Sequence, residues 1–177
     1  TYHIPSRFDE GYGFSVAAAT QAVEDGVNLI VTADIGVRDH AAVDAAAAGG
    51  VDVLICDHHL PAGATVPERA IVLCPPQSGC TYRNQSLAAC GVSLKLAQAL
   101  LADHPQHERI IRSLLKLAAV GTVADLVPLT TLENRAIVRL GLDAGMKCYN
   151  KKGWWVSGHN NWNQVCNGGI GTGALAI

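Results

Sequence analysis

Carboxylate and imidazole side chains follow apolar runs at several places along the chain. The candidates for chemistry are Asp34, the adjacent triplet Asp57, His58 and His59, and Asp125. Asp oxygens with one or two imidazoles and no thiolate suit octahedral Mn²⁺ or Mg²⁺ better than structural zinc. A shared carboxylate such as Asp34 can hold two ions about 3.5–4 Å apart, the geometry that activates water against a phosphoryl group. The pattern therefore indicates a divalent-metal site.

Each candidate also has a structural explanation. A single Asp after a strand commonly caps the next helix or forms a turn. Taken alone, Asp34 is explained at least as well by such a structural role as by metal binding, and the same holds for Asp125. An Asp-His-His triplet at the end of a buried strand is harder to explain in that way. Adjacent side chains of an extended segment point to opposite sides. We therefore assign His58 to the metal and His59 to a substrate phosphate, with the reverse assignment as the alternative.

The elements that must position these residues alternate between helix and strand. Helices are expected at 15–24, 40–48, 92–102, 110–120 and 133–142, and strands at 27–32, 51–56 and 70–74. The predicted fold class is α/β, a mostly parallel sheet flanked by helices, with its strands buried on both faces. Ligand sites in such sheets lie beyond the carboxyl ends of the strands. Residues 121–129 are expected to break the helix as a polar loop that brings Asp125 to the site if it folds over this edge.

Composition excludes several classes of protein. The 177 residues are 49% hydrophobic and 16% charged with a net charge of -2, which fits one soluble α/β-sized domain. No apolar run approaches the roughly 18 residues that are needed to cross a membrane. The high apolar content and the small net charge also exclude a disordered chain. Without a basic surplus, nucleic-acid binding has to come from a specific site. The 6 scattered cysteines predict reduced, structural thiols and a cytoplasmic location, with a zinc site as the minor alternative.

Several segments occur in an order that is typical of one family. They lie at residues 2–7, 10–13, 32–36, 57–61, 80–82, 87–92, 121–125 and 133–135. Together they resemble the RecJ single-strand-specific exonucleases within the DHH phosphoesterase family, over roughly residues 1 to 145. The combination separates this group from shorter members that act on nanoRNA or cyclic dinucleotides.

The resemblance implies a role for each candidate residue. Asp34 would bridge two Mn²⁺ or Mg²⁺ ions, and His58 and Asp125 would bind one of them. His59 would contact the scissile phosphate, and Asp57 would orient an imidazole by hydrogen bonding, which fixes its tautomer and direction.

The resemblance also implies a substrate and partners. The reaction would be hydrolysis that removes nucleotides from the 5′ end of single-stranded DNA, in DNA repair and recombination. Arg7 and Arg135 would contact substrate phosphates, although a single Arg is more often simply solvated. The expected partner is single-stranded DNA; no membrane is expected, and nothing points to an obligate oligomer.

The chain departs from the family pattern in ways that affect activity. RecJ-like proteins carry an Asp-rich metal motif before the segment that corresponds to residues 2–7. Further on they carry a second family domain and an oligonucleotide-binding fold. This sequence contains none of these three parts. We therefore expect the chain to be the interior of a longer protein, and by itself to bind metal weakly and hydrolyse little or nothing. The alternatives are a DHH phosphoesterase for short oligonucleotides or cyclic dinucleotides, and a non-catalytic scaffold. Retention of Asp34, His58 and Asp125 argues against the scaffold.

The amino-acid composition of the chain changes near Gly145: all 3 tryptophans lie after this residue. Segments of the tail at 153–155 and 160–169 resemble part of the heparinase II/III-like polysaccharide lyases. We predict a partial DHH phosphoesterase domain at residues 1–145 and an unrelated or irregular tail at 146–177, with the join of a chimera near Met146.

Overall fold

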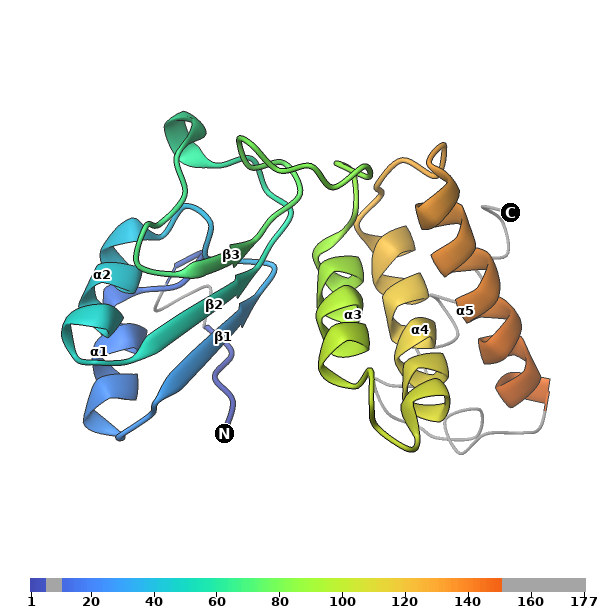
Figure 1. The fold of residues 1–177 in the computed structure, drawn as a ribbon, viewed down its shortest axis with the longest axis horizontal. Coiled ribbons are helices and arrows are strands. Elements are labelled where there is room, and N and C mark those ends of the chain that lie inside the picture. The colour runs from blue at the N-terminus through green and yellow to red at the C-terminus, as the bar shows by residue number, and fades with distance from the viewer. Residues whose placement is uncertain (6–10, 151–177) are drawn as a thin grey trace. The chain divides into compact units, whose positions relative to one another are not determined.

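The computed structural model describes residues 1–5 and 11–150. The chain forms two compact units, Thr1–Gln85 and Ser86–Ile177. The first contains a sheet with helices and the second is helical where it is described (Figure 1). The predicted α/β class and parallel sheet are confirmed by the first unit.

The first unit follows the predicted alternation of helix and strand closely. Its elements are α1 (Val16–Glu24), β1 (Leu29–Ala33), α2 (His40–Ala48), β2 (Asp52–Cys56), the 3₁₀ turn η1 (Ala62–Ala64) and β3 (Ile71–Leu73). Ser15 starts α1, because its hydroxyl oxygen accepts a hydrogen bond from the Ala18 amide at 3.1 Å. Gly26, with φ +69°, lets the chain turn out of the helix toward β1.

The sheet is parallel, in the order β1-β2-β3, and its register decides where the strand-end residues lie. Ala33 pairs with Cys56, so the first residue after each strand is at the same level. The Asp34 amide donates to the Cys56 carbonyl at 2.9 Å, and the Asp57 amide donates to the Leu73 carbonyl at 3.1 Å. The carboxyl ends of β1 and β2 therefore present Asp34 and Asp57 side by side.

Only one face of the sheet is buried by helices of its own unit. The helices α1 and α2 lie on one face of the sheet (Figure 1). There Val53 and Ile55 from β2 pack with Ala19, Val43 and Ala46 of these helices in one apolar core. On β1 the side chains alternate, and Leu29 and Val31 remain 53% and 54% exposed. The prediction that the strands are buried on both faces is wrong for β1, because α1 and α2 cover the opposite face.

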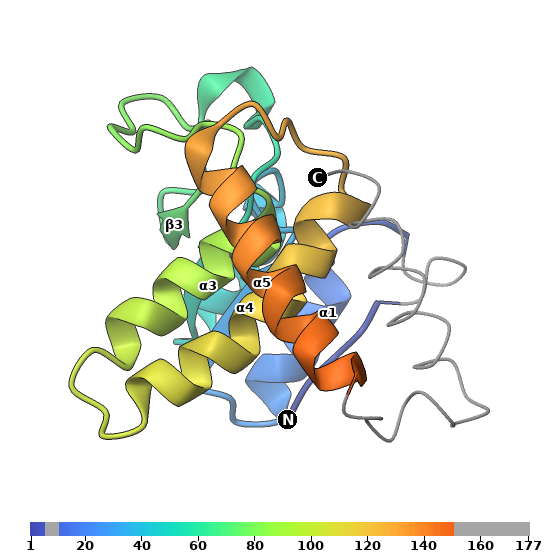
Figure 2. The same cartoon turned by 90° about the vertical axis from the view of Figure 1, so that its right-hand side faces the viewer.

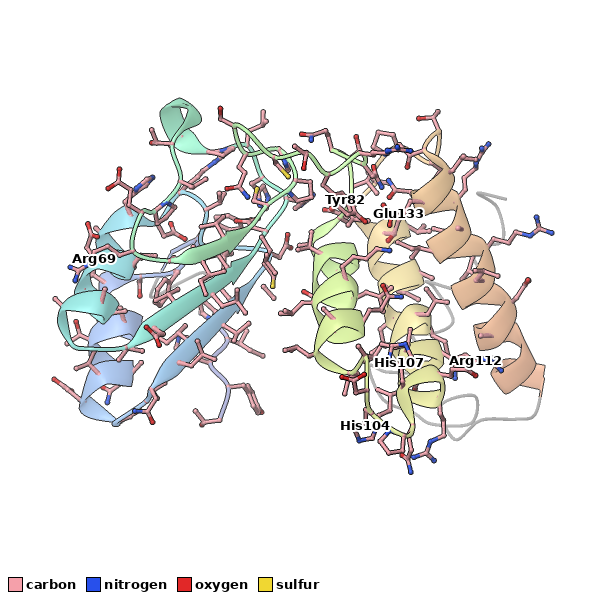
Figure 3. The ribbon with its side chains drawn as sticks, viewed as in Figure 1. Arg69, Tyr82, His104, His107, Arg112 and Glu133 are labelled. Carbon is pink, nitrogen blue, oxygen red and sulfur yellow. The ribbon has the colours of Figure 1, made fainter. Side chains whose placement is uncertain are left out.

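The second unit contains α3 (Ala89–Leu100), α4 (His107–Ala124) and α5 (Leu132–Asn150), seen together in Figure 2. Glu133, in the first turn of α5 (Figure 3), forms an ion pair with Lys95 of α3 at 2.7 Å. Asn134, beside it, is 0% exposed and donates to the Ser86 and Pro128 carbonyls, both at 2.9 Å. These contacts anchor the start of α5 to α3 and to the loop that follows Asp125.

The predicted helix break at 121–129 is wrong over its first residues, since α4 continues to Ala124. A Cβ on Gly121 would lie 2.7 Å from the Cys90 sulfur. The absence of a side chain at Gly121 therefore allows α3 and α4 to approach closely. The loop begins only after Asp125, which is the C-cap residue of α4.

Two predictions concern residues outside the described range. Arg7 and the tryptophan-rich segment from 151 onward are among these residues, so the phosphate contact and the tail resemblance stay predictions. The described part of α5 continues to Asn150, past the composition change near Gly145. None of the described helices is long and apolar enough to cross a bilayer.

Candidate metal centre

A tight turn after β1 holds Asp34 in an unusual conformation. Its φ is +68°, in the left-handed region that L-residues seldom adopt. The turn is closed by the Thr32 hydroxyl, which donates to the Ile35 carbonyl at 2.8 Å. Gly36, at φ +116°, is required because a Cβ there would lie 2.7 Å from the Thr32 oxygen. Backbone strain at a carboxylate on a strand end is typical of a functional position.

Asp34 does not cap the helix that follows it. The residue preceding α2 is Asp39, whose carboxylate accepts a hydrogen bond from the Phe14 amide at 2.7 Å. The capping explanation of Asp34 is therefore not what the structure contains.

Asp57 is buried, with 1% of its surface exposed, and is surrounded by donors. One oxygen accepts from the Val37 amide at 3.0 Å, while the other accepts from the His58 and His59 amides at 2.7 and 3.2 Å. That second oxygen also lies 2.7 Å from the His59 Nδ1. Burial by itself raises the pKa of Asp57, but the hydrogen bonds from Val37, from the His59 ring and from the His59 and His58 amides outweigh it and lower the pKa below its usual value.

The two imidazoles converge rather than diverge. Ligand atoms of Asp34, His58 and His59 all lie within 4.8 Å of one another, and the His rings are 4.6 Å apart between centroids. The His58 Nε2, which is buried, lies 3.3 Å from Asp34 Oδ1. The prediction that adjacent side chains point to opposite sides is wrong here, because β2 ends at Cys56 and the next residues curl around the Asp57 carboxylate.

The donor set fits a divalent cation. Asp34 offers a carboxylate oxygen at the solvent surface, with its side chain 59% exposed, and the His58 and His59 side chains are 15% and 33% exposed. Asp57 holds Nδ1 of His59, so Nε2 is the ring nitrogen left for a ligand. Cys74 lies close by and donates to the His59 carbonyl at 3.3 Å. Burial and the nearby Asp57 charge raise the pKa of Cys74 to about 11, so the thiol is neutral and is not part of the donor set.

The structure brings together Asp34, Asp57, His58 and His59 within the first unit. Asp125 and Arg135 belong to the second unit, where Asp125 caps the end of α4 and Arg135 is exposed near the start of α5. Their participation in the site stays a proposal.

Three contributors were missed by the sequence reasoning. The Val37 amide holds Asp57 through the backbone, across 20 residues, so no side-chain pattern signals it. Tyr12 meets the His59 ring edge-on at 6.4 Å, and Arg38 donates from Nε to the Leu60 carbonyl at 2.7 Å.

Tyr12, Val37 and Arg38 line a cavity of about 80 Å³ that also includes His59 of the metal cluster. Its lining includes Tyr12, Gly13, Gly36, Arg38, Asp57 and His59.

Comparison with known proteins identifies relatives of this architecture. Residues 1–122 match the model of the DHH family, N-terminal domain. The single-stranded-DNA-specific exonuclease RecJ of Bacillus subtilis is 45% identical over 142 residues, which are 80% of this chain and 17% of that protein. RecJ of Escherichia coli is 39% identical over 150 residues, 80% of this chain and 26% of that protein. The chain thus spans only about a sixth to a quarter of the length of these relatives.

Solved structures agree with the sequence matches. An exonuclease RecJ crystallised with manganese aligns with a TM-score of 0.64 and 29% identity, over 93% of this chain and 42% of that one. RecJ from Thermus thermophilus in complex with Mn²⁺ aligns with a TM-score of 0.60 and 30% identity, over 80% of this chain and 20% of that one. The resemblance to RecJ-like proteins that was inferred for residues 1–145 is confirmed.

Proposed function

The chain belongs to the DHH family, and on that premise we propose that it is part of a divalent-metal-dependent exonuclease that hydrolyses phosphodiester bonds of single-stranded DNA. The observation that carries this proposal is the cluster of Asp34, His58 and His59 at the carboxyl edge of the sheet. Removal of nucleotides from the 5′ end, a role in DNA repair and recombination, and a cytoplasmic location are further parts of the proposal.

The proposed cofactor is Mn²⁺ or Mg²⁺. Asp34 and His58 would hold it from the first unit, and Asp125 is the proposed ligand from the second. When bound, the ion supplies Lewis-acid chemistry that lowers the pKa of water and offsets charge on phosphoryl oxygens. Binding and orientation of the substrate phosphate are proposed roles of the side chains around Asp34.

His59 is proposed to bind the scissile phosphate. Its Nδ1 faces the Asp57 carboxylate at 2.7 Å, which fixes the orientation of the ring. In this orientation Nε2 is the ring nitrogen left to face a phosphate oxygen. The reverse assignment, with His59 on the metal and His58 on the phosphate, would use the same ring nitrogen of His59.

A calorimetric Mn²⁺ titration of the purified chain tests the proposal. The variant is Asp34→Asn, which keeps size and tolerates the left-handed backbone but removes the charge. The control is Asp52→Asn, at the opposite end of β2, where the carboxylate is exposed. We expect weak binding by the parent and the control, and at least roughly 10-fold weaker binding by Asp34→Asn. Equal binding by all three proteins, or binding by none, would contradict a metal centre at Asp34.

A further inference from the structure

Arg38 is the cationic side chain that the turn after β1 places beside the metal cluster. It lines the same cavity as His59 and Asp57. Its Nε donates to the Leu60 carbonyl at 2.7 Å, across 22 residues, so the base of the guanidinium is fixed although the side chain is exposed. The remaining N–H groups of the guanidinium provide donors in a planar fork that matches phosphate geometry.

The cavity is small and its carboxylates are already engaged as acceptors. Its volume of about 80 Å³ is well below the roughly 300 Å³ at which pockets enclose whole ligands, so it suits a single group such as a phosphate and not a nucleoside. Asp57 accepts from the Val37 amide at 3.0 Å, and Asp39 accepts from the Phe14 amide at 2.7 Å. Among the side chains that line the cavity, Arg38 therefore supplies the N–H donors for an incoming phosphate.

We propose that Arg38 binds a backbone phosphate of single-stranded DNA in this cavity, next to the phosphate held by His59. The inference rests on the proposed function and adds to it a second phosphate subsite within the first unit. Pre-organisation by Leu60 reduces the conformational entropy that an exposed Arg loses on binding. Arg38 thus contributes to substrate affinity and not to holding the metal.

The test uses the whole chain and a dT12 oligonucleotide with phosphorothioate linkages that resist hydrolysis. Binding is followed by fluorescence anisotropy in Mn²⁺ at several salt concentrations. The variant is Arg38→Met, and Arg38→Lys keeps the charge without the planar fork. The control is Arg69→Met: Arg69 is exposed and stands 2 residues before β3, at the amino ends of the strands (Figure 3). Circular dichroism checks that each variant is folded.

We expect Arg38→Met to weaken oligonucleotide binding roughly 10-fold and to reduce the slope of log affinity against log salt by about 0.7, the value for one single-strand phosphate contact. Arg38→Lys should fall between parent and Met, and Arg69→Met should match the parent. Mn²⁺ affinity should stay within about 2-fold in every variant, because a phosphate contact does not touch the metal.

The other outcomes separate the two proposals. If Arg38→Met binds the oligonucleotide with the parent's affinity and salt slope, the phosphate subsite is wrong while the exonuclease proposal stands. A parallel loss of Mn²⁺ and oligonucleotide affinity with an unchanged salt slope would show that Arg38 only positions Leu60 and the histidines, which also overturns the subsite. If the parent binds neither Mn²⁺ nor oligonucleotide, the proposed function itself fails and the subsite with it.

Discussion

At the scale of the residue, Asp34 combines a metal-binding side chain with a costly backbone. A left-handed conformation costs an L-residue about 1–2 kcal/mol, and somewhat less for Asp, whose side chain can hydrogen-bond locally. Glycine adopts φ +68° without that cost. We expect Asp34→Gly to increase the free energy of unfolding by about 1 kcal/mol while it abolishes Mn²⁺ binding, as measured by urea denaturation and calorimetry.

Leu126 provides the comparison, because it is the other non-glycine residue with positive φ in the described ranges, at +55°. Leu126→Gly should give a similar gain in stability, since the side chain is 86% exposed and little packing is lost. If Asp34→Gly lowers the free energy of unfolding while Leu126→Gly raises it, the Asp34 side chain stabilises the turn and the strain argument is wrong.

The strand-end candidates were predictable, whereas their directions were not. Parallel strands with apolar runs must end at one edge, so Asp34 and Asp57 were expected to lie near each other, as the register of Ala33 with Cys56 shows. The directions of His58 and His59 depend on backbone amides that bond to a buried carboxylate. Such bonds form only after the chain has folded, so spacing alone gave the wrong geometry.

At the scale of the element, glycines inside helices decide how closely the helices of the second unit pack. A Cβ on Gly141 of α5 would clash with the Ala119 side chain and with the Leu115 carbonyl oxygen of α4. Because the carbonyl belongs to the backbone, it cannot move aside as a flexible side chain would. We expect Gly141→Ala to lower the free energy of unfolding by about 2 kcal/mol or more, measured by urea denaturation.

Gly145, one turn further along α5, is the matched control. A Cβ there meets nothing within 4 Å in the described part of the chain. Gly145→Ala should therefore stabilise the protein by up to about 1 kcal/mol, because alanine favours the helix more than glycine does. Equal effects of the two substitutions would contradict close packing of α5 on α4 at Gly141.

The same glycine chemistry explains why one helix boundary was predicted wrongly. The sequence predicts that residues 121–129, beginning with Gly121, break the helix as a polar loop. In the structure Gly121 lies against Cys90 of α3, and the helix continues for three more residues to Ala124. A contact between two helices overrides local propensity, and it cannot be seen in a window of sequence.

At the scale of the whole molecule, burial was the feature least predictable from sequence. Continuous β-branched runs indicated strands covered on both faces, and α1 and α2 cover only one. Leu29, Val31 and Ile71 are 53%, 54% and 68% exposed on the other face. An apolar run in the sequence shows only that a strand is apolar. Whether helices cover one face of the sheet or both depends on the tertiary arrangement of the helices, which the run itself does not contain.

That exposed face predicts a measurable property of the isolated chain. Apolar side chains that adjoin across neighbouring strands bind dyes such as ANS, which report accessible apolar surface. Val31 on β1 pairs in register with Leu54 on β2, and Leu54 pairs with Ile71 on β3, so the three form a row across the sheet. We expect the folded chain to enhance ANS fluorescence and Val31→Thr, which keeps the β-branched shape, to reduce that enhancement without lowering the thermal midpoint by more than about 2 °C.

Val43 supplies the control for this measurement, because it is 0% exposed in the core between the helices and the sheet. Val43→Thr replaces a buried methyl group of that core by a hydroxyl, which removes apolar packing and should lower the thermal midpoint clearly. An ANS signal that Val31→Thr leaves unchanged would mean that this row is covered in solution. In that case the strands are buried on both faces after all, as their sequence pattern predicts.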